Sequence, residues 1–197
     1  MATESRPKVF EGARDIILSL GVTVIAMLLV VGATGLCSVN PEKSGPVQTV
    51  DAATFLEMEA RAEGAVIREP QMPEGWTATA ARRVQVGPQS ASVVSWLTPG
   101  DGYVESAQTA ATLEEATKNY DANYREEHTH RVIDGQEFSI YASEDKDVRP
   151  LWVAYLGDAR LILTGAAPDA DFEAALKAFV AAAPLQIDAE GNVVEGK

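Results

Sequence analysis

Cysteine and histidine are the scarcest of the residues that usually carry chemistry in this chain. One cysteine, Cys37, and two histidines, His128 and His130, occur among its 197 residues. A single cysteine excludes a disulfide within the chain. The sequence also lacks a glycine-rich phosphate loop, a dinucleotide-binding fingerprint and a G-x-S-x-G nucleophile elbow. We therefore expect no enzymatic activity and no catalytic, cofactor-binding or metal-binding residues.

The two histidines form the pattern closest to a metal site. His128 and His130 are separated by one residue and follow Glu126 and Glu127, and alternate residues of a strand point to the same face. A zinc site, however, needs three or four ligands held by further hydrogen bonds. The sequence has no other histidine to complete such a set. We interpret both histidines as exposed residues at a junction between a helix and a strand.

Basic residues are few relative to acidic ones. The chain has 16 Lys and Arg against 29 Asp and Glu, a formal net charge of −13. This charge repels phosphate backbones, so we expect no nucleic-acid partner. The acids stand side by side, as in Glu114 and Glu115, or in the run SEDKDVRP at 143–150. Glycoside hydrolysis needs carboxylates that face each other across a cleft, and the run lacks the glycine and terminal glutamate of an EF-hand loop. We interpret these acids as solvated surface groups.

Charged residues are missing completely from residues 16–36, IILSLGVTVIAMLLVVGATGL. A helix rises about 1.5 Å per residue, so a segment of this length reaches across a hydrocarbon core of about 30 Å. The apolar part of a secretory signal is usually shorter, at about 7–15 residues. The sequence therefore predicts a transmembrane helix over residues 16–37 that acts as an uncleaved signal anchor.

Two alternatives for the end of this segment stay open. Small residues at Ala33 and Gly35 resemble a signal-peptidase cleavage site. Cys37 is a position for lipid attachment, although a bacterial lipobox needs a small residue directly before the cysteine and Leu36 stands there. In the signal-anchor interpretation, Cys37 is simply a small residue near the outer membrane boundary.

The positions of lysine and arginine predict the orientation. Arg6, Lys8 and Arg14 precede the apolar segment, whereas Lys43 alone follows it closely. Positive residues stay on the cytoplasmic side. We therefore expect a single-pass protein of the inner (plasma) membrane, with residues 1–15 in the cytoplasm and the C-terminal domain outside.

Composition also predicts the domain boundaries. Residues 38–50 contain Pro41, Gly45 and Pro46 and have no periodic pattern, which is typical of a linker. An extracytoplasmic domain is expected over residues 51–184. Residues 185–197 again lack a pattern, so we expect a flexible tail.

Periodicity and turn residues predict the elements of this domain. Helices are expected over residues 51–64, 112–127 and 169–184, with Asp51 and Thr112 as N-caps and Glu115 completing a capping box. A three-stranded meander is expected from three segments, 76–86, 90–99 and 103–109. Two hairpins are expected around Asp134-Gly135 and Gly157-Asp158. The fold class is therefore α+β, with an antiparallel sheet packed against two or three helices.

Aromatic side chains on the predicted strands supply most of the expected core. Alternation along a strand sends them toward the helices, and tryptophan and tyrosine bury large areas. Among these strand aromatics, Trp76, which follows Pro73 and Gly75 in a turn-rich corner, is the one that we expect to be most exposed.

Several segments of the chain carry a family resemblance. They are the N-terminal apolar span, the tether ending in VD, and the motifs PQMPEGW, TATAAR, YVESAQT, VIDGQEFSIYAS and LILTGAA. Together these segments resemble the DUF4245 family of actinobacterial single-pass envelope proteins. The resemblance runs from the span to the last predicted helix. It implies an actinobacterial inner membrane, a domain on its outer side, and no catalytic residues to transfer to this chain.

We therefore expect a non-catalytic accessory or assembly subunit of a larger inner-membrane complex. An actinobacterial respiratory supercomplex is one such complex that the resemblance suggests. Ser19, Thr23 and small residues such as Gly21 permit close contact between the apolar helix and a partner helix within the lipid bilayer. The alternative is an envelope binding module for a lipid, peptide or glycan, which requires a pocket in the sheet domain.

Overall fold

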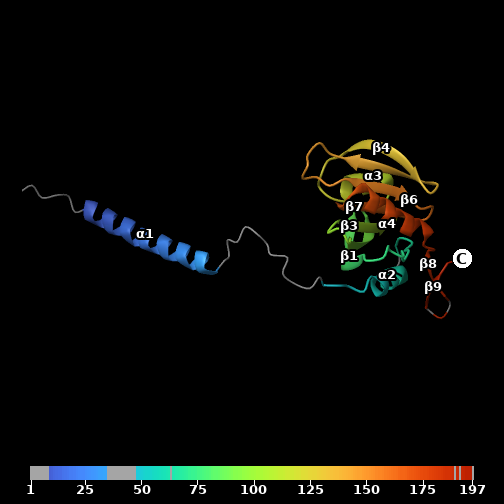
Figure 1. Ribbon diagram of the computed structural model, residues 1–197, viewed down its shortest axis with the longest axis horizontal. Helices are drawn as coiled ribbons and strands as arrows, with labels where there is room; N and C mark the ends of the chain where they lie inside the picture. Colours follow the sequence, from blue (N-terminus) through green and yellow to red (C-terminus); the bar gives the residue numbers. More distant parts are fainter. Residues whose placement is uncertain (1–8, 35–47, 63, 189, 191, 197) are drawn as a thin grey trace, which may run out of the picture. The chain divides into compact units, whose positions relative to one another are not determined.

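The computed structural model describes residues 9–34, 48–62, 64–188, 190 and 192–196. The chain divides between Pro46 and Val47 into an N-terminal unit and a C-terminal domain (Figure 1). Cys37 and most of the predicted linker, residues 38–50, lie outside the described residues, as do most of residues 1–15.

The N-terminal unit contains helix α1, Val9–Thr34. Its large apolar side chains are exposed over the described length of the helix, with Ile16 and Met27 both 69% accessible. The hydroxyl of Thr23 donates a hydrogen bond to the Ser19 carbonyl at 2.9 Å. The predicted helix is present. In the part of the chain that the structure describes, no helix meets the combined length and apolarity required of a membrane span, so the transmembrane part of that prediction lacks support.

The C-terminal domain is built on a seven-stranded antiparallel sheet. Its strand order is β1-β2-β3-β7-β6-β5-β4. The strands are β1 Thr77–Val86, β2 Gln89–Leu97, β3 Tyr103–Thr109, β4 Glu126–Ile133, β5 Gln136–Ala142, β6 Leu151–Tyr155 and β7 Arg160–Ala166. A meander of three strands and a meander of four meet where β3 pairs with β7. The predicted α+β fold with an antiparallel sheet is confirmed.

Helices cover both faces of this sheet. Helix α4, Asp169–Ala181, packs Phe172, Leu176 and Phe179 on one face, which we call the α4 face. There Trp152 is stacked between Phe138 and Phe172, with ring centroids 5.1 and 5.2 Å apart. Helix α3, Leu113–Asn119, packs Ala116 on the opposite face, which we call the α3 face. The sheet is therefore the middle layer of the domain.

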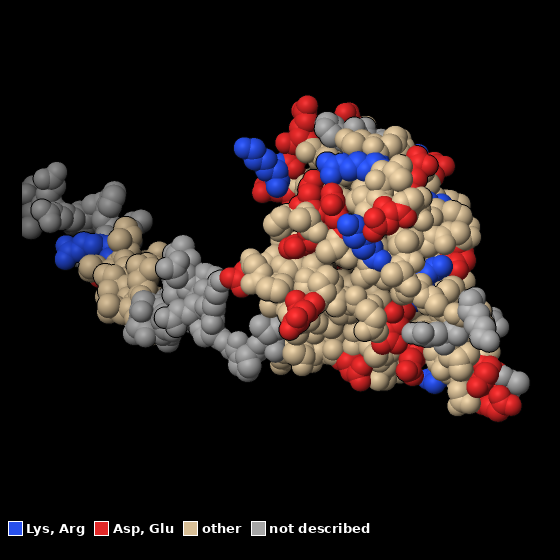
Figure 2. Space-filling model, turned by 45° about the vertical axis from the view of Figure 1, so that its right-hand side comes forward, with Lys and Arg blue, Asp and Glu red and all other residues tan. Residues whose placement is uncertain are grey.

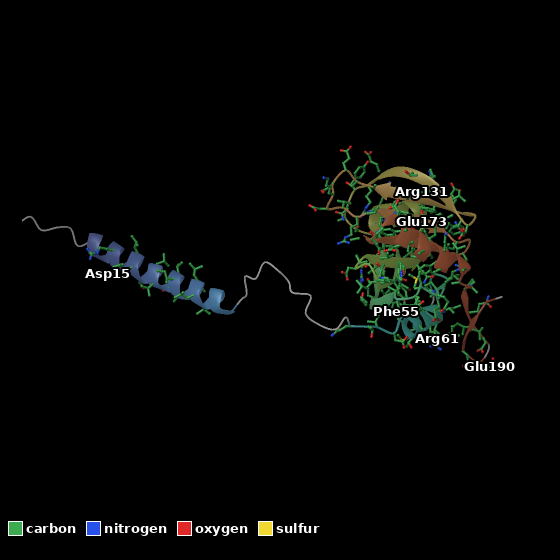
Figure 3. All side chains as sticks on the ribbon, viewed as in Figure 1. Asp15, Phe55, Arg61, Arg131, Glu173 and Glu190 are labelled. Carbon is green, nitrogen blue, oxygen red and sulfur yellow. The ribbon has the colours of Figure 1, made fainter. Side chains whose placement is uncertain are left out.

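A surface cluster also joins α4 to the edge strand β4. Arg131 of β4 lies 3.6 Å from the carboxylate of Glu173 and 3.4 Å from that of Asp169, both on α4, and Figure 3 labels Arg131 and Glu173. The Arg131 guanidinium lies 5.6 Å from the ring centroid of Trp152. The edge strand is thus tied to the helix through both charge and cation–π contacts.

Helix α2, Ala52–Arg61, starts at the predicted cap, because the Asp51 side chain accepts a hydrogen bond from the Thr54 backbone N–H. Its Leu56 is 1% exposed and belongs to a cluster with Val94 and Trp96 of β2. Trp76 is half-buried and packs against both this cluster and the α4 cluster, so its prediction as the most exposed aromatic residue is wrong. Tyr155 of β6, at 53%, is more exposed.

Two of the predicted boundaries that differ from the structure have a local explanation. Helix α3 ends at Asn119 rather than at residue 127. The Asp121 carboxylate accepts a hydrogen bond from the Asn123 backbone N–H and forms an ion pair with Arg125. These contacts replace the hydrogen bonds that would continue the helix. The segment predicted to be a flexible tail contains two paired strands, β8 Leu185–Ile187 and β9 Val193–Glu195. The turn between them is closed by Asp188, whose side chain accepts from the Asn192 backbone N–H.

Candidate functional site

Helix α3 leaves part of its face of the sheet uncovered, and a pocket lies there. The pocket has a volume of about 330 Å³. Its walls come from strands β1, β3 and β7, from the chain that follows α3, and from the loop before β6. It is lined by Arg82, Val84, Tyr103, Glu105, Tyr120, Asp121, Asn123, Arg125, Asp147, Arg149 and Thr164.

Strand register places the floor of this pocket. Ser95 of β2 is paired with Glu105 of β3, and Glu105 is paired with Thr164 of β7. Paired residues point to the same face of a sheet. Ala107 lies two residues from Glu105 and packs in the α3 cluster, so all three polar side chains point to the α3 face.

Glu105 is the centre of the pocket, and four side chains donate hydrogen bonds to it. Its side chain is only 8% exposed. The Tyr120 hydroxyl donates to Oε1 at 2.5 Å. Arg82 Nη2 donates to Oε2 at 2.6 Å, with the Tyr103 hydroxyl at 3.2 Å and the Ser95 hydroxyl at 3.3 Å from the same oxygen. A buried carboxylate is stable only when compensated in this way.

The hydrogen bonds determine the protonation states. Burial is the largest single influence on Glu105 and opposes ionisation. The hydrogen bonds from Tyr120, Arg82 and Tyr103, together with the charge of Arg82, outweigh it, so the Glu105 pKa lies below the ordinary value. For Tyr120, burial and then the Glu105 charge raise the pKa above its ordinary value. The hydrogen bond to Glu105 likewise raises the pKa of Arg82. At neutral pH the three groups are therefore a carboxylate, a neutral phenol and a guanidinium.

A second ion pair forms one wall. Both terminal nitrogens of Arg125 lie 2.8 Å from the carboxylate oxygens of Asp121, and its Nε donates to the Arg149 carbonyl at 2.6 Å. The Arg125 side chain is only 2% exposed. The guanidinium of Arg149 lies 5.2 Å from the ring centroid of Tyr103. Arg125 thus fixes the backbone of the loop that carries Arg149 over the pocket.

This arrangement is suited to binding rather than to proton transfer. A general acid or base works best with a pKa near the operating pH. The pKa of Glu105 is lowered and those of Tyr103 and Tyr120 are raised, so each shift moves away from neutrality. Guanidinium groups and an aromatic ring can instead hold a polar ligand in a fixed orientation.

The histidine pattern does not lead to a metal centre in the described residues. His130 lies on β4, 60% exposed, with its Nδ1 3.0 Å from the Ser139 hydroxyl and 3.9 Å from the Glu137 carboxylate. The side chains of His128 and Glu127 lie outside the described residues. Where the structure describes side chains, no group of three or more His, Cys, Asp or Glu is placed to hold a metal ion.

Sequence reasoning missed most of the pocket. Two of its residues, Asp147 and Arg149, lie in the run SEDKDVRP that we interpreted as a solvated loop, and both are indeed exposed. The signal for Glu105 was a charged residue in the middle of the predicted strand YVESAQT. On such a strand it shares a face with the apolar Ala107, which is unfavourable unless partners compensate the charge.

Comparison with known proteins gives a family and no function. No curated protein and no solved structure matches the chain. A family model described as "Protein of unknown function (DUF4245)" matches residues 8–179, a range that includes α1, the whole seven-stranded sheet and most of α4. Because this match covers most of the 197 residues, the chain belongs to the DUF4245 family.

Proposed function

We propose that this protein is a non-catalytic accessory or assembly subunit of a larger inner-membrane complex. In this proposal α1 anchors it in the lipid bilayer, its N-terminus is cytoplasmic, and its acidic domain lies on the outer face. The observation that carries the proposal is the exposure of apolar side chains all around α1. The side chains at three successive positions, Ile16, Ile17 and Leu18, are 58–69% exposed, and successive helix positions differ by about 100°. A helix that is apolar all round needs lipid or other protein to cover it.

The middle of α1 has a surface suited to a partner helix. At Gly21 an added Cβ would meet nothing within 4 Å, so the helix has a small notch there. The Thr23 hydroxyl is already bonded to the Ser19 carbonyl, so it introduces no unsatisfied donor. Small residues at such a position let two helix backbones approach closely. An integral membrane complex, such as the respiratory supercomplex suggested by the resemblance, is the proposed partner.

The charge of the domain fits a position in the aqueous phase outside the membrane. Figure 2 shows acidic side chains spread over the visible face, with basic ones among them. A net negative charge disfavours adsorption to anionic lipid. Attachment to the membrane would therefore depend on α1 and the partner, and not on the domain surface.

The test is affinity purification of the tagged full-length protein in mild detergent. The native protein is compared with a variant whose residues 16–36 are replaced by an unrelated apolar helix. A finer comparison uses Gly21→Leu, which fills the notch, and Ala26→Leu, which adds similar bulk on another side of α1. Co-purification of a stoichiometric complex with the native protein and Ala26→Leu, but not with the other two, supports the proposal. A protein that purifies alone in every case overturns it.

A second candidate function is an extracytoplasmic binding module. The pocket around Glu105 favours it, because a functional cleft is concave and contains a few convergent polar groups. A purely structural carboxylate needs its hydrogen bonds but needs no open volume beside them. The two candidates do not exclude each other, since the helix serves the first and the pocket serves the second.

A further inference from the structure

We propose that the pocket around Glu105 binds a singly charged oxyanion, a carboxylate or a phosphodiester group, through Arg149 and Arg82. This inference rests on the binding-module candidate and names its ligand class. Both side chains come from the α3 face of the domain, one from the loop before β6 and one from β1. Guanidinium groups recognise such anions through paired N–H donors.

The charges inside the pocket point to an anion. Arg125 is neutralised by Asp121, and Arg82 is neutralised by Glu105. Arg149 has no carboxylate partner within the described residues, and its contact there is the face of the Tyr103 ring. Within the described residues, Arg149 is thus the pocket arginine that makes no ion pair. An anionic ligand would complete such a pair.

Arg82 can supply further donors to the same ligand. Its Nη2 is committed to Glu105 at 2.6 Å, and its Nη1 is only 3.5 Å from the Ser95 hydroxyl. Its Nε has no hydrogen-bond partner among the described residues, and 47% of the side chain is exposed. A guanidinium has five N–H donors, so Arg82 can hold Glu105 and an anion at once.

Basic residues concentrate at this pocket against the charge of the whole domain. Three arginines and three acids line it, whereas the chain as a whole has 16 basic and 29 acidic residues. The pocket is therefore close to neutral within an acidic surface. An anion is therefore repelled less at the pocket than over the rest of the acidic surface.

The remaining carboxylate at the rim limits the charge of the ligand. Asp147 lies in the same loop as Arg149 and also lines the pocket. Together with Glu105 it repels a second negative charge. The pocket should therefore prefer a monoanion to a dianion. Neutralising Asp147 should weaken this preference.

The experiment is a titration followed by NMR of the Arg Nε–H groups in the full-length protein in a maltoside detergent. The probes are acetate, dimethyl phosphate and inorganic phosphate at pH 8, with ionic strength held constant by chloride. We expect saturable shifts of the Arg149 and Arg82 signals with acetate or dimethyl phosphate, at least tenfold tighter than with the phosphate dianion. Asp147→Asn should narrow that difference.

Matched variants decide whether the binding is specific. Arg149→Gln should weaken binding at least tenfold, whereas Arg61→Gln, at an exposed position of α2 outside the pocket, should leave it unchanged. Shifts that do not saturate, or that survive Arg149→Gln, overturn the proposal. A short-chain phosphatidylglycerol, tested below its micelle concentration, distinguishes a lipid headgroup from a free anion as the source of the phosphodiester.

Failure of this inference can be distinguished from failure of the binding-module candidate. Glucose is titrated in the same way as a neutral polar probe. If glucose binds saturably and the anions do not, the pocket is a binding site and the anion inference is wrong. If neither class of probe shifts the signals of the pocket, both are overturned. The accessory-subunit proposal is unaffected by either result, since it is tested through α1.

Discussion

The hydroxyl of Tyr120 donates a 2.5 Å hydrogen bond to Oε1 of Glu105, which joins the end of α3 to a central strand of the sheet. The other carboxylate oxygen, Oε2, accepts a hydrogen bond from Arg82 of β1. One buried acid therefore connects an edge strand, an inner strand and a helix. Its contacts set both the stability of the domain and the shape of the pocket.

The first prediction concerns Tyr120→Phe. The substitution leaves Oε1 of Glu105, whose side chain is only 8% exposed, without its donor, and a buried unsatisfied acceptor costs about 1–3 kcal/mol. We expect the free energy of unfolding, measured by urea denaturation of the full-length protein, to fall by that amount. Tyr124→Phe is the control, because Tyr124 is 79% exposed, and it should change stability by less than about 0.5 kcal/mol. Equal effects of the two variants would contradict the role assigned to Tyr120.

The second prediction concerns pH. The Glu105 pKa is lowered below 4.5 in the folded domain, so its contribution to stability is fully present above the unfolded pKa and is lost as pH falls through the folded value. The stability difference between the native protein and Glu105→Gln should therefore be constant near neutrality and shrink below about pH 4.5. Urea denaturation from pH 7 to pH 3 measures it. A difference that grows on acidification would show that Glu105 is not held as a carboxylate.

Local parts of this fold were predictable from sequence, and the pocket was not. The Thr112 capping box, the α2 cap and the turn at Asp134-Gly135 depend on residues close together in the chain, and the structure has all three. The pairing of β3 with β7 joins residues more than fifty positions apart. Without that register, nothing places Glu105 near Thr164 and the Arg149 loop.

The ends of elements depended on competing local hydrogen bonds. Helical periodicity continues past Asn119, but the Asp121 side chain accepts hydrogen bonds from both the Asn123 N–H and Arg125. The strand β8 pairs with β9, and Leu185 also donates its N–H to the Ile67 carbonyl, far away in the sequence. A periodic pattern reports which side chains are apolar. It does not report which distant backbone groups will be available for hydrogen bonding.

The third prediction concerns the ion pair between Arg68 and Asp158. The Arg68 side chain is 9% exposed, and its two terminal nitrogens lie 2.5 and 3.0 Å from the Asp158 carboxylate oxygens. Asp158→Ala leaves the buried Arg68 charge without its carboxylate and should lower the free energy of unfolding. The loss should stay below the roughly 3 kcal/mol of a fully buried pair, because the Asp158 side chain is 34% exposed. Lys118→Ala removes an exposed pair with Glu114 and should cost at most about 0.5 kcal/mol. Thermal and urea denaturation of the three proteins provide the comparison, and an effect of Asp158→Ala no larger than that of Lys118→Ala would contradict the role assigned to the Arg68 pair.

The fourth prediction concerns Gly165 at the junction of the two meanders. Its φ is +147°, and a Cβ built there would clash with the Tyr103 carbonyl oxygen, a backbone atom that cannot move without disturbing the β3–β7 pairing. Gly165→Ala should therefore lower the melting temperature strongly or prevent folding. Gly157→Ala is the matched control, because Gly157 also has a positive φ of +95° but an added Cβ there meets nothing within 4 Å. It should cost about 1–2 kcal/mol, from the positive φ alone. If both alanine variants melted at similar temperatures, the close approach of β3 to Gly165 would not be what excludes a side chain at this junction of the meanders.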